Sequence, residues 1–209
     1  MTRSDSFCLS LFFVLCFILV SCGGSKVMLP PKINLKSYDT IGLVAFSTNT
    51  KGNLAQFATQ RFVESLQSAQ AGVRILELGD EEKVLQSVQE NEFTLKTITA
   101  VGKLYEVDAL FIGQLNVSDI KPDVDLSTVL KTLSADAEVE ATLTTRLYET
   151  RDAATIWTDS SRRRETIAHV TLATGGVGDF NASDPEAAYG RLVDGLVLDV
   201  TRDFRVRYE

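Results

Sequence analysis

The stretch Ala109-Leu-Phe-Ile-Gly-Gln-Leu115 (ALFIGQL) is a short apolar run, and it predicts a strand inside a sheet. A run of this length between polar segments is typical of a strand with both faces covered. An earlier run, Tyr38–Phe46 (YDTIGLVAF), has the same character, and Val73–Leu78 predicts a further strand between the two. The strand at Ala109–Leu115 could reach Ile120.

The segments between these strands have helical periodicity. Apolar residues recur at helical spacing from Leu54 to Ala69, with Asn53 available as an N-cap and Gly72 at the end. Two more helices are predicted before residue 109, one after Asp80 and one containing Leu95, Ile98, Val101 and Leu104. Strands that alternate with helices pair most simply in one sheet with the helices packed on it.

The second half of the chain changes character. From Asp136 to Tyr148 apolar and polar residues alternate, which predicts an antiparallel strand with one solvated face. A turn at Glu149–Asp152 leads to a return strand, 154–161, which carries Trp157. Residues 165–173 could add another strand, 174–183 predict a flexible loop, and Asp184-Pro185 begins a last helix. The expected fold is α/β: one mixed sheet (β-α-β-α-α-β), then an antiparallel β-hairpin and a C-terminal helix.

The N-terminus predicts export. A charged start precedes the apolar run Phe7–Val20, which is shorter than the roughly 20 residues that a membrane-spanning helix needs. The run ends in Leu19-Val20-Ser21-Cys22, which resembles the lipobox of bacterial lipoproteins. That resemblance implies recognition of Leu19, Val20 and Ser21, cleavage before Cys22, and acylation (palmitate among the acyl groups) of Cys22. We therefore expect a signal peptide at 1–21, a lipidated tether at 22–37 and a domain at 38–209.

Charge and cysteine content restrict what the mature chain can do. Cys8 and Cys16 lie in the predicted signal peptide, so Cys22 would remain as the single cysteine, without a disulfide or a thiolate metal cage. The net charge of −7 argues against nucleic-acid binding. Membrane attachment would rest on acyl chains. Gly23 and Gly24 after the cysteine resemble the sorting signal of outer-membrane lipoproteins and imply a domain facing the periplasm.

No residues form a recognisable catalytic, cofactor or metal site. His169 is the single histidine, and we interpret it as structural or exposed. The Gly175–Gly178 segment lacks the Rossmann spacing and the Walker lysine. Asp119, Asp123 and Asp125 supply oxygen ligands but lack the glycine and glutamate of an EF-hand. We interpret Trp157 as core or interface packing and Arg162–Arg164 as a solvated strand or turn.

The pattern of the mature chain resembles a group of envelope lipoproteins. The group includes the curli-secretion channel lipoprotein CsgG, the penicillin-binding-protein activator LpoB and the N-terminal domain of TolB. The resemblance rests on the first strand Ile41–Phe46 with its helix, the strand Val73–Leu78, the run Ala109–Leu115, and the hairpin Leu147–Trp157. It implies an α/β domain that works by binding periplasmic partners without catalysis.

Two functions remain open from the sequence. The first is a lipid-anchored assembly or regulatory factor that binds another envelope protein. The second is a subunit of a CsgG-like outer-membrane secretion complex, for which a homo-oligomer is compatible with the sequence. A channel subunit needs two long membrane-crossing hairpins, and only Asp136–Tyr148 and Ser160–Thr171 approach such strands, so a full set is not expected. Three polar connections are candidate partner surfaces: Ser47–Gly52, Asp119–Leu133 and Thr174–Phe180.

Overall fold

The computed structural model describes residues 27–50, 52–118, 121–125, 132–173, 178–181 and 185–208. The predicted signal peptide, Cys22 and Asp119 lie outside these residues. The described chain divides into a main unit, Pro31–Arg205, and a small unit that contains the short antiparallel pair β1 (Met28–Leu29) and β10 (Arg207–Tyr208). No helix among the described residues combines the length and the apolar character needed to cross a membrane.

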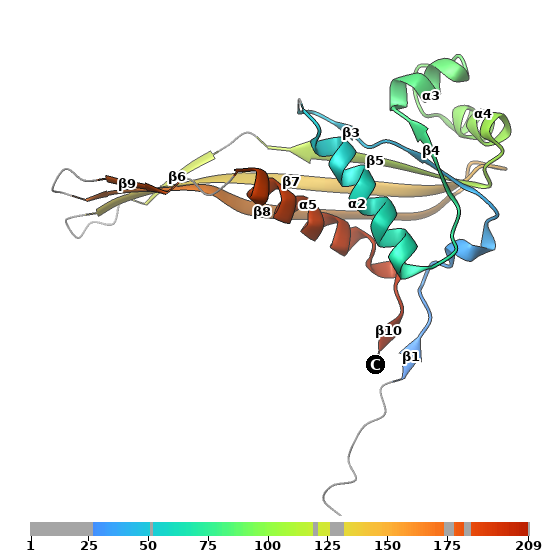
Figure 1. Cartoon of the computed structure of the whole chain (residues 1–209). Helices are drawn as coiled ribbons and strands as arrows, with labels where there is room; N and C mark the ends of the chain where they lie inside the picture. The colour runs from blue at the N-terminus through green and yellow to red at the C-terminus, as the bar shows by residue number, and fades with distance from the viewer. Residues whose placement is uncertain are drawn as a thin grey trace, which may run out of the picture. The chain divides into compact units, whose positions relative to one another are not determined.

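The main unit is built on one mixed sheet (Figure 1). Its strand order is β4-β2-β5-β7-β8-β9, with β3 paired to β5 and β6 paired to β7. The first three neighbours in this order are parallel and the remaining pairs along it are antiparallel, which confirms the predicted α/β class with a single mixed sheet. The bounds of the strands are β2 Ile41–Val44, β3 Ser47–Thr48, β4 Ile75–Gly79, β5 Ala109–Val117, β6 Lys121–Asp125, β7 Thr132–Glu149, β8 Thr155–Ala173 and β9 Gly178–Asn181.

Helices cover both faces of the sheet. On one face lie α2 (Leu54–Ala69) and α5 (Pro185–Val200), and on the other lie α3 (Glu81–Ser87) and α4 (Leu95–Tyr105) (Figure 1). As predicted, all four residues of β2 are buried, and α5 begins with proline. The larger core, between the sheet and α2 and α5, contains Phe62, Phe111, Trp157 and Phe204. Trp157 therefore packs in the core, one of the two roles predicted for it.

The chain enters the main unit earlier than residue 38. A 3-10 turn, η1 (Leu35–Ser37), lies within the segment assigned to the tether, and Leu35 is fully buried in the larger core. The backbone N–H groups of Lys32 and Ile33 donate to the carbonyl of Asp203, in the C-terminal 3-10 turn η2 (Arg202–Phe204). The packed domain therefore includes residues that the sequence analysis placed in the tether.

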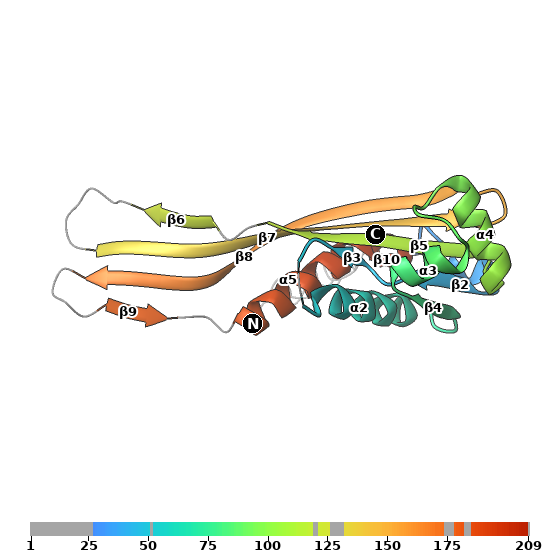
Figure 2. The ribbon, with the colours of Figure 1, turned by 90° about the horizontal axis from the view of Figure 1, so that it is seen from above.

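Three expectations for the second half need correction. Residues 154–161 and 165–173 were expected as separate strands, but β8 is one strand of 19 residues. The expected loop 174–183 contains β9, and the expected connection Asp119–Leu133 contains β6. The chain therefore has two hairpins, β6–β7 and β8–β9, which lie side by side at one end of the sheet (Figure 2). β6 and β9, with five and four residues, are shorter than the about 9–11 residues of a membrane-crossing strand, so the expectation that a full set of membrane-crossing hairpins is missing stays a prediction.

Candidate functional site

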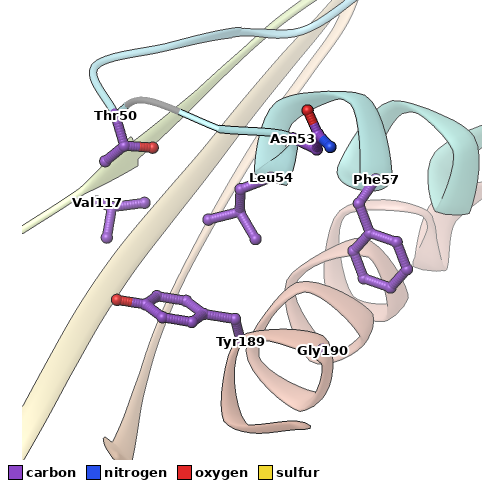
Figure 3. Close-up of a pocket in the computed structure, with 7 residues that line it drawn as sticks. All are labelled: Thr50, Asn53, Leu54, Phe57, Val117, Tyr189 and Gly190. Carbon is purple, nitrogen blue, oxygen red and sulfur yellow. The ribbon is translucent and has the colours of Figure 1, made fainter. Parts of the chain in front are cut away.

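A groove between α2, α5 and the end of β5 is the candidate functional site (Figure 3). Its volume is about 560 Å³. The apolar lining comes from Leu54 and Phe57 on α2, Val117 on β5 and Tyr189 on α5. Thr50 and Asn53 add polar groups from the loop before α2. Sites for small ligands and partner side chains share this combination of an apolar lining and a few polar groups.

The loop beside the groove is fixed to the sheet by Asn49. The side-chain amide of Asn49 donates to the carbonyl of Val117, and its side-chain oxygen accepts from the N–H of Val117, both at 2.9 Å. The Asn49 side chain thereby pairs with both the backbone N–H and the carbonyl of Val117, the last residue of β5, as a neighbouring strand would. Thr50 follows directly and lines the groove. Among the side chains that the structure describes, Ser47–Gly52 is the predicted partner surface that contributes to this site.

The two helices are held together beside the groove by Arg61. Its Nε lies 3.1 Å from a carboxylate oxygen of Asp194 on α5, and its guanidinium lies 5.1 Å from the centre of the Phe57 ring. Hydrogen bonding to Glu64 and the charge of Asp194 raise the pKa of Arg61. The cation therefore covers the outer side of Phe57 and joins α2 to α5.

Gly190 leaves the groove open. It lies within α5, and a Cβ atom built on it would meet no atom of the described residues within 4 Å. Glycine within a helix costs about 1 kcal/mol relative to alanine, so alanine would fit here and stabilise the helix. By contrast, a Cβ on Gly195 of the same helix would lie 2.7 Å from the Arg163 side chain. Close packing of the Arg163 side chain against α5 explains why position 195 is glycine. The open space at Gly190 is instead part of the groove.

The other residues singled out in the sequence do not form a site together. Asp123 lies in β6, and its register partner is Asp136 of β7, which in turn pairs with His169 of β8. Asp125 is two residues further along β6. Within the described ranges, no group of three or more His, Cys, Asp or Glu residues could hold a metal ion. Tyr189 and Gly190 line the groove without having been predicted as site residues.

The three arginines at Arg162–Arg164 lie in β8 and are exposed, one of the two settings predicted for them. Arg164 pairs with Glu138 at 3.2 Å and with Glu140 at 3.3 Å, both on β7. Arg163 reaches the opposite face, where its Nε and Nη2 donate to Asp199 of α5 at 2.9 and 3.0 Å. The Ser161 hydroxyl donates to the same carboxylate at 2.9 Å. These contacts attach α5 to β8.

The contact between α5 and β8 predicts an acid-sensitive contribution to stability. The hydrogen bond from Arg163 is the main cause that holds the pKa of Asp199 below its ordinary value. A carboxylate with a lower pKa in the folded state stabilises the fold above its unfolded-state pKa, about 4, and this contribution disappears as the pH falls through the folded-state pKa. We expect Asp199→Asn to destabilise the protein at pH 7 and the difference from wild type to shrink below about pH 4. Urea unfolding between pH 7 and pH 3 measures this, and a difference that is constant with pH would contradict it.

Comparison with known proteins adds similarity of structure only. No protein-family model and no curated protein matches the sequence. The PelC dodecamer from Paraburkholderia phytofirmans is similar at 11% identity and a TM-score of 0.45, covering 88% of this chain and 98% of that chain. Lipoprotein GNA1162 from Neisseria meningitidis is similar at 14% identity and a TM-score of 0.39, covering 78% and 97%. The LpoB C-terminal domain from Salmonella enterica is similar at 10% identity and a TM-score of 0.37, covering 69% and 89%.

LpoB is one of the proteins named in the sequence resemblance, and GNA1162 is described as a lipoprotein. At these identities and TM-scores, the functions of these proteins are not transferred to this chain.

Proposed function

We propose that this chain is a lipid-anchored protein of the bacterial envelope whose domain binds another envelope protein without catalysing a reaction. In this proposal Cys22 carries the acyl anchor in the outer membrane, the tether follows it, and the domain faces the periplasm as an assembly or regulatory factor. The groove between α2 and α5 is the observation that carries the binding function. Its apolar lining and open Gly190 position suit an apolar side chain from a protein partner.

Site-specific photocrosslinking in intact cells tests the binding function. A benzophenone amino acid at position 190 should capture one protein in high yield, which mass spectrometry would identify. The matched control carries the same amino acid at Leu198, an exposed position on the same helix that does not line the groove. The same products at equal yield from both positions would contradict binding in the groove.

Filling the groove should separate folding from binding. Gly190→Ala is expected to raise the free energy of unfolding by about 0.5–1 kcal/mol, because alanine is the better helix former and meets no neighbour. Gly190→Trp should leave the domain folded but reduce crosslinking or co-purification of the partner at least tenfold. Leu198→Trp, outside the groove, is the control. Undiminished partner binding by a folded Gly190→Trp protein would exclude the groove.

The predicted anchor has its own test. Replacing Cys22 with serine removes the thiol that an acyl group needs, so we expect the variant to leave the membrane fraction and to lose metabolic labelling with palmitate. Wild type should sediment with outer membranes and begin at an acylated Cys22. An unlabelled wild-type protein that stays soluble after fractionation would contradict the anchor. That result would leave the groove experiment unaffected.

The strand register favours a second candidate, the subunit of a CsgG-like secretion complex. Val124, Ala135, Val170 and Phe180 occupy one register row across β6, β7, β8 and β9. The next row along is polar, with Asp123, Asp136, His169 and Asn181. Rows that alternate in this way are the pattern expected of membrane-crossing hairpins. Conductance across liposomes that hold the purified protein would support this candidate, and liposomes that stay sealed would count against it.

A further inference from the structure

The outer edge of β8 is a long, unpaired strand edge. On its inner side β8 pairs with β7 over nearly its whole length. On its outer side β9 pairs only with His169–Leu172, and within the described part of the chain no strand pairs with Thr155–Thr166. Figure 2 shows this part of β8 at the margin of the sheet. Backbone N–H and C=O groups along such an edge can accept another strand.

The sequence of this edge protects it only in part against strand addition. Natural proteins protect edges by keeping them short, by covering them, or with charged side chains (lysine above all), proline and bulges. The opposite edge of the sheet, β4, has only five residues. The stretch Thr155–Thr166 contains neither proline nor lysine. Its pairing with β7 is irregular at its first residues, between Thr155 and Trp157, and again just beyond its end, between Thr166 and Ala168; from Trp157 to Thr166 the pairing is regular. Its charges, Asp159, Arg162–Arg164 and Glu165, have both signs.

We propose that this edge pairs antiparallel with the same edge of a second copy of the chain, about a two-fold axis at Ser161. A two-fold axis normal to the sheet keeps each face on its own side, so opposing residues must come from the same face. Ser161 and Arg163 lie on the face that contacts α5. Asp159 shares that face by the alternation of the strand.

Charge selects the register. An axis at Asp159 would place this carboxylate opposite itself, and an axis at Arg162 or Arg163 would oppose two arginines. An axis at Ser161 places Asp159 opposite Arg163 of the other copy, twice, and Ser160 opposite Arg162. This register also aligns Ile156 with Thr166, so the paired region covers nearly all of the free edge.

Arg163 has donors left for this contact. A guanidinium carries five N–H groups, and Asp199 accepts from Nε and Nη2. The Arg163 side chain is 43% exposed. The intermolecular pair with Asp159 would therefore add to the pair with Asp199 without replacing it. The inference goes beyond the proposed function and does not depend on the groove.

Cysteine crosslinking of the full chain in detergent tests the axis. Opposing residues of antiparallel strands have Cα atoms about 4.5–5.5 Å apart, within the range of a disulfide. Ser161→Cys should therefore form a covalent dimer under mild oxidation. Thr158→Cys is the matched control, because its two copies would lie about 20 Å apart along the strands. The parent chain measures any background from Cys22. Equal dimer yields from positions 161 and 158 would overturn the register.

Charge reversal tests the same contact without a crosslink. In sedimentation equilibrium, Asp159→Arg should raise the dimer dissociation constant about tenfold or more, because each ion pair becomes a repulsion. Glu92→Arg, at an exposed residue of the α3–α4 connection, should leave the constant unchanged. Hydrogen exchange of the Thr155–Thr166 amides should slow as protein concentration rises. A chain that stays monomeric with fast exchange at this edge, or one whose edge is protected only by a different protein, overturns the proposal.

Discussion

Replacing Phe111 with alanine is expected to lower the free energy of unfolding by about 3–5 kcal/mol. Phe111 lies on β5 and is fully buried. Its ring makes edge-to-face contacts with Phe62 of α2 at 5.2 Å, with Phe204 of η2 at 5.8 Å and with Trp157 of β8 at 6.3 Å. The substitution leaves a cavity where a helix, two strands and the C-terminal turn meet, and these elements cannot all move in to fill it.

The single tryptophan makes this measurement direct. Trp157 contacts Phe111 and is 7% exposed, so its fluorescence reports unfolding of this part of the core during urea titration. Leu104→Ala is the control, since Leu104 is an exposed apolar residue on α4 and should change stability by less than about 0.5 kcal/mol. A decrease in the free energy of unfolding of less than about 1 kcal/mol for Phe111→Ala would mean that the aromatic cluster does not stabilise the packing of β5 against α2, β8 and η2.

The elements predicted correctly are those whose signal is local. The run Ala109–Leu115 is apolar except for Gln114, and it lies in β5, where every residue of the run except Ile112 and the exposed Gln114 is buried. The helical stripe from Leu54 to Ala69 contains Phe62 and Leu66, both fully buried. Proline at the start of α5 and the alternation in β7 are also properties of a few neighbouring residues. Each of these patterns fixes an element without knowledge of its partners.

The elements missed are short or highly charged and give only a weak local signal. β6 and β9 have five and four residues, and each pairs in a hairpin with the longer strand next to it in sequence. Arg162–Arg164 lie between the two strands that were predicted separately, and within one long β8 Glu138, Glu140 and Asp199 supply the opposite charges. These acids lie more than 20 residues away from the arginines in sequence. No local pattern could show that they meet.

The groove was predicted in part. The polar loop Ser47–Gly52 could be identified because it follows a buried strand, and Thr50 does line the site. Tyr189 and Gly190 fall in the predicted last helix, and neither was predicted to line a site. A glycine beside an apolar stripe in a helix is a usable signal, because it lowers helix propensity without being at a cap. That Gly190 lines a groove depends on the open space next to it among the described residues, which the sequence does not show.

Replacing Gln70 with leucine is expected to cost about 3–5 kcal/mol, because it leaves several buried backbone groups unsatisfied. Gln70 follows α2 and is 5% exposed. Its Oε1 accepts from the N–H of Leu35 at 2.9 Å, and its Nε2 donates to the carbonyls of Ile33 at 2.7 Å and Phe204 at 3.0 Å. One side chain therefore joins the first packed residues of the main unit, its last turn and α2.

The control for Gln70 is Gln67→Leu, an exposed position three residues earlier in α2, which should change stability by less than about 0.5 kcal/mol. The Gln70→Leu variant should also expose the Ile33–Ser37 amides to rapid hydrogen exchange before the sheet unfolds, since their attachment is lost first. In the proposed arrangement, with Cys22 as the membrane anchor, any pull from the membrane reaches the domain through this segment. Gln70→Leu should therefore release Ile33–Ser37 from the domain and lengthen the tether. An unchanged exchange rate at Leu35 would show that apolar burial of that residue alone secures the point where the tether joins the domain.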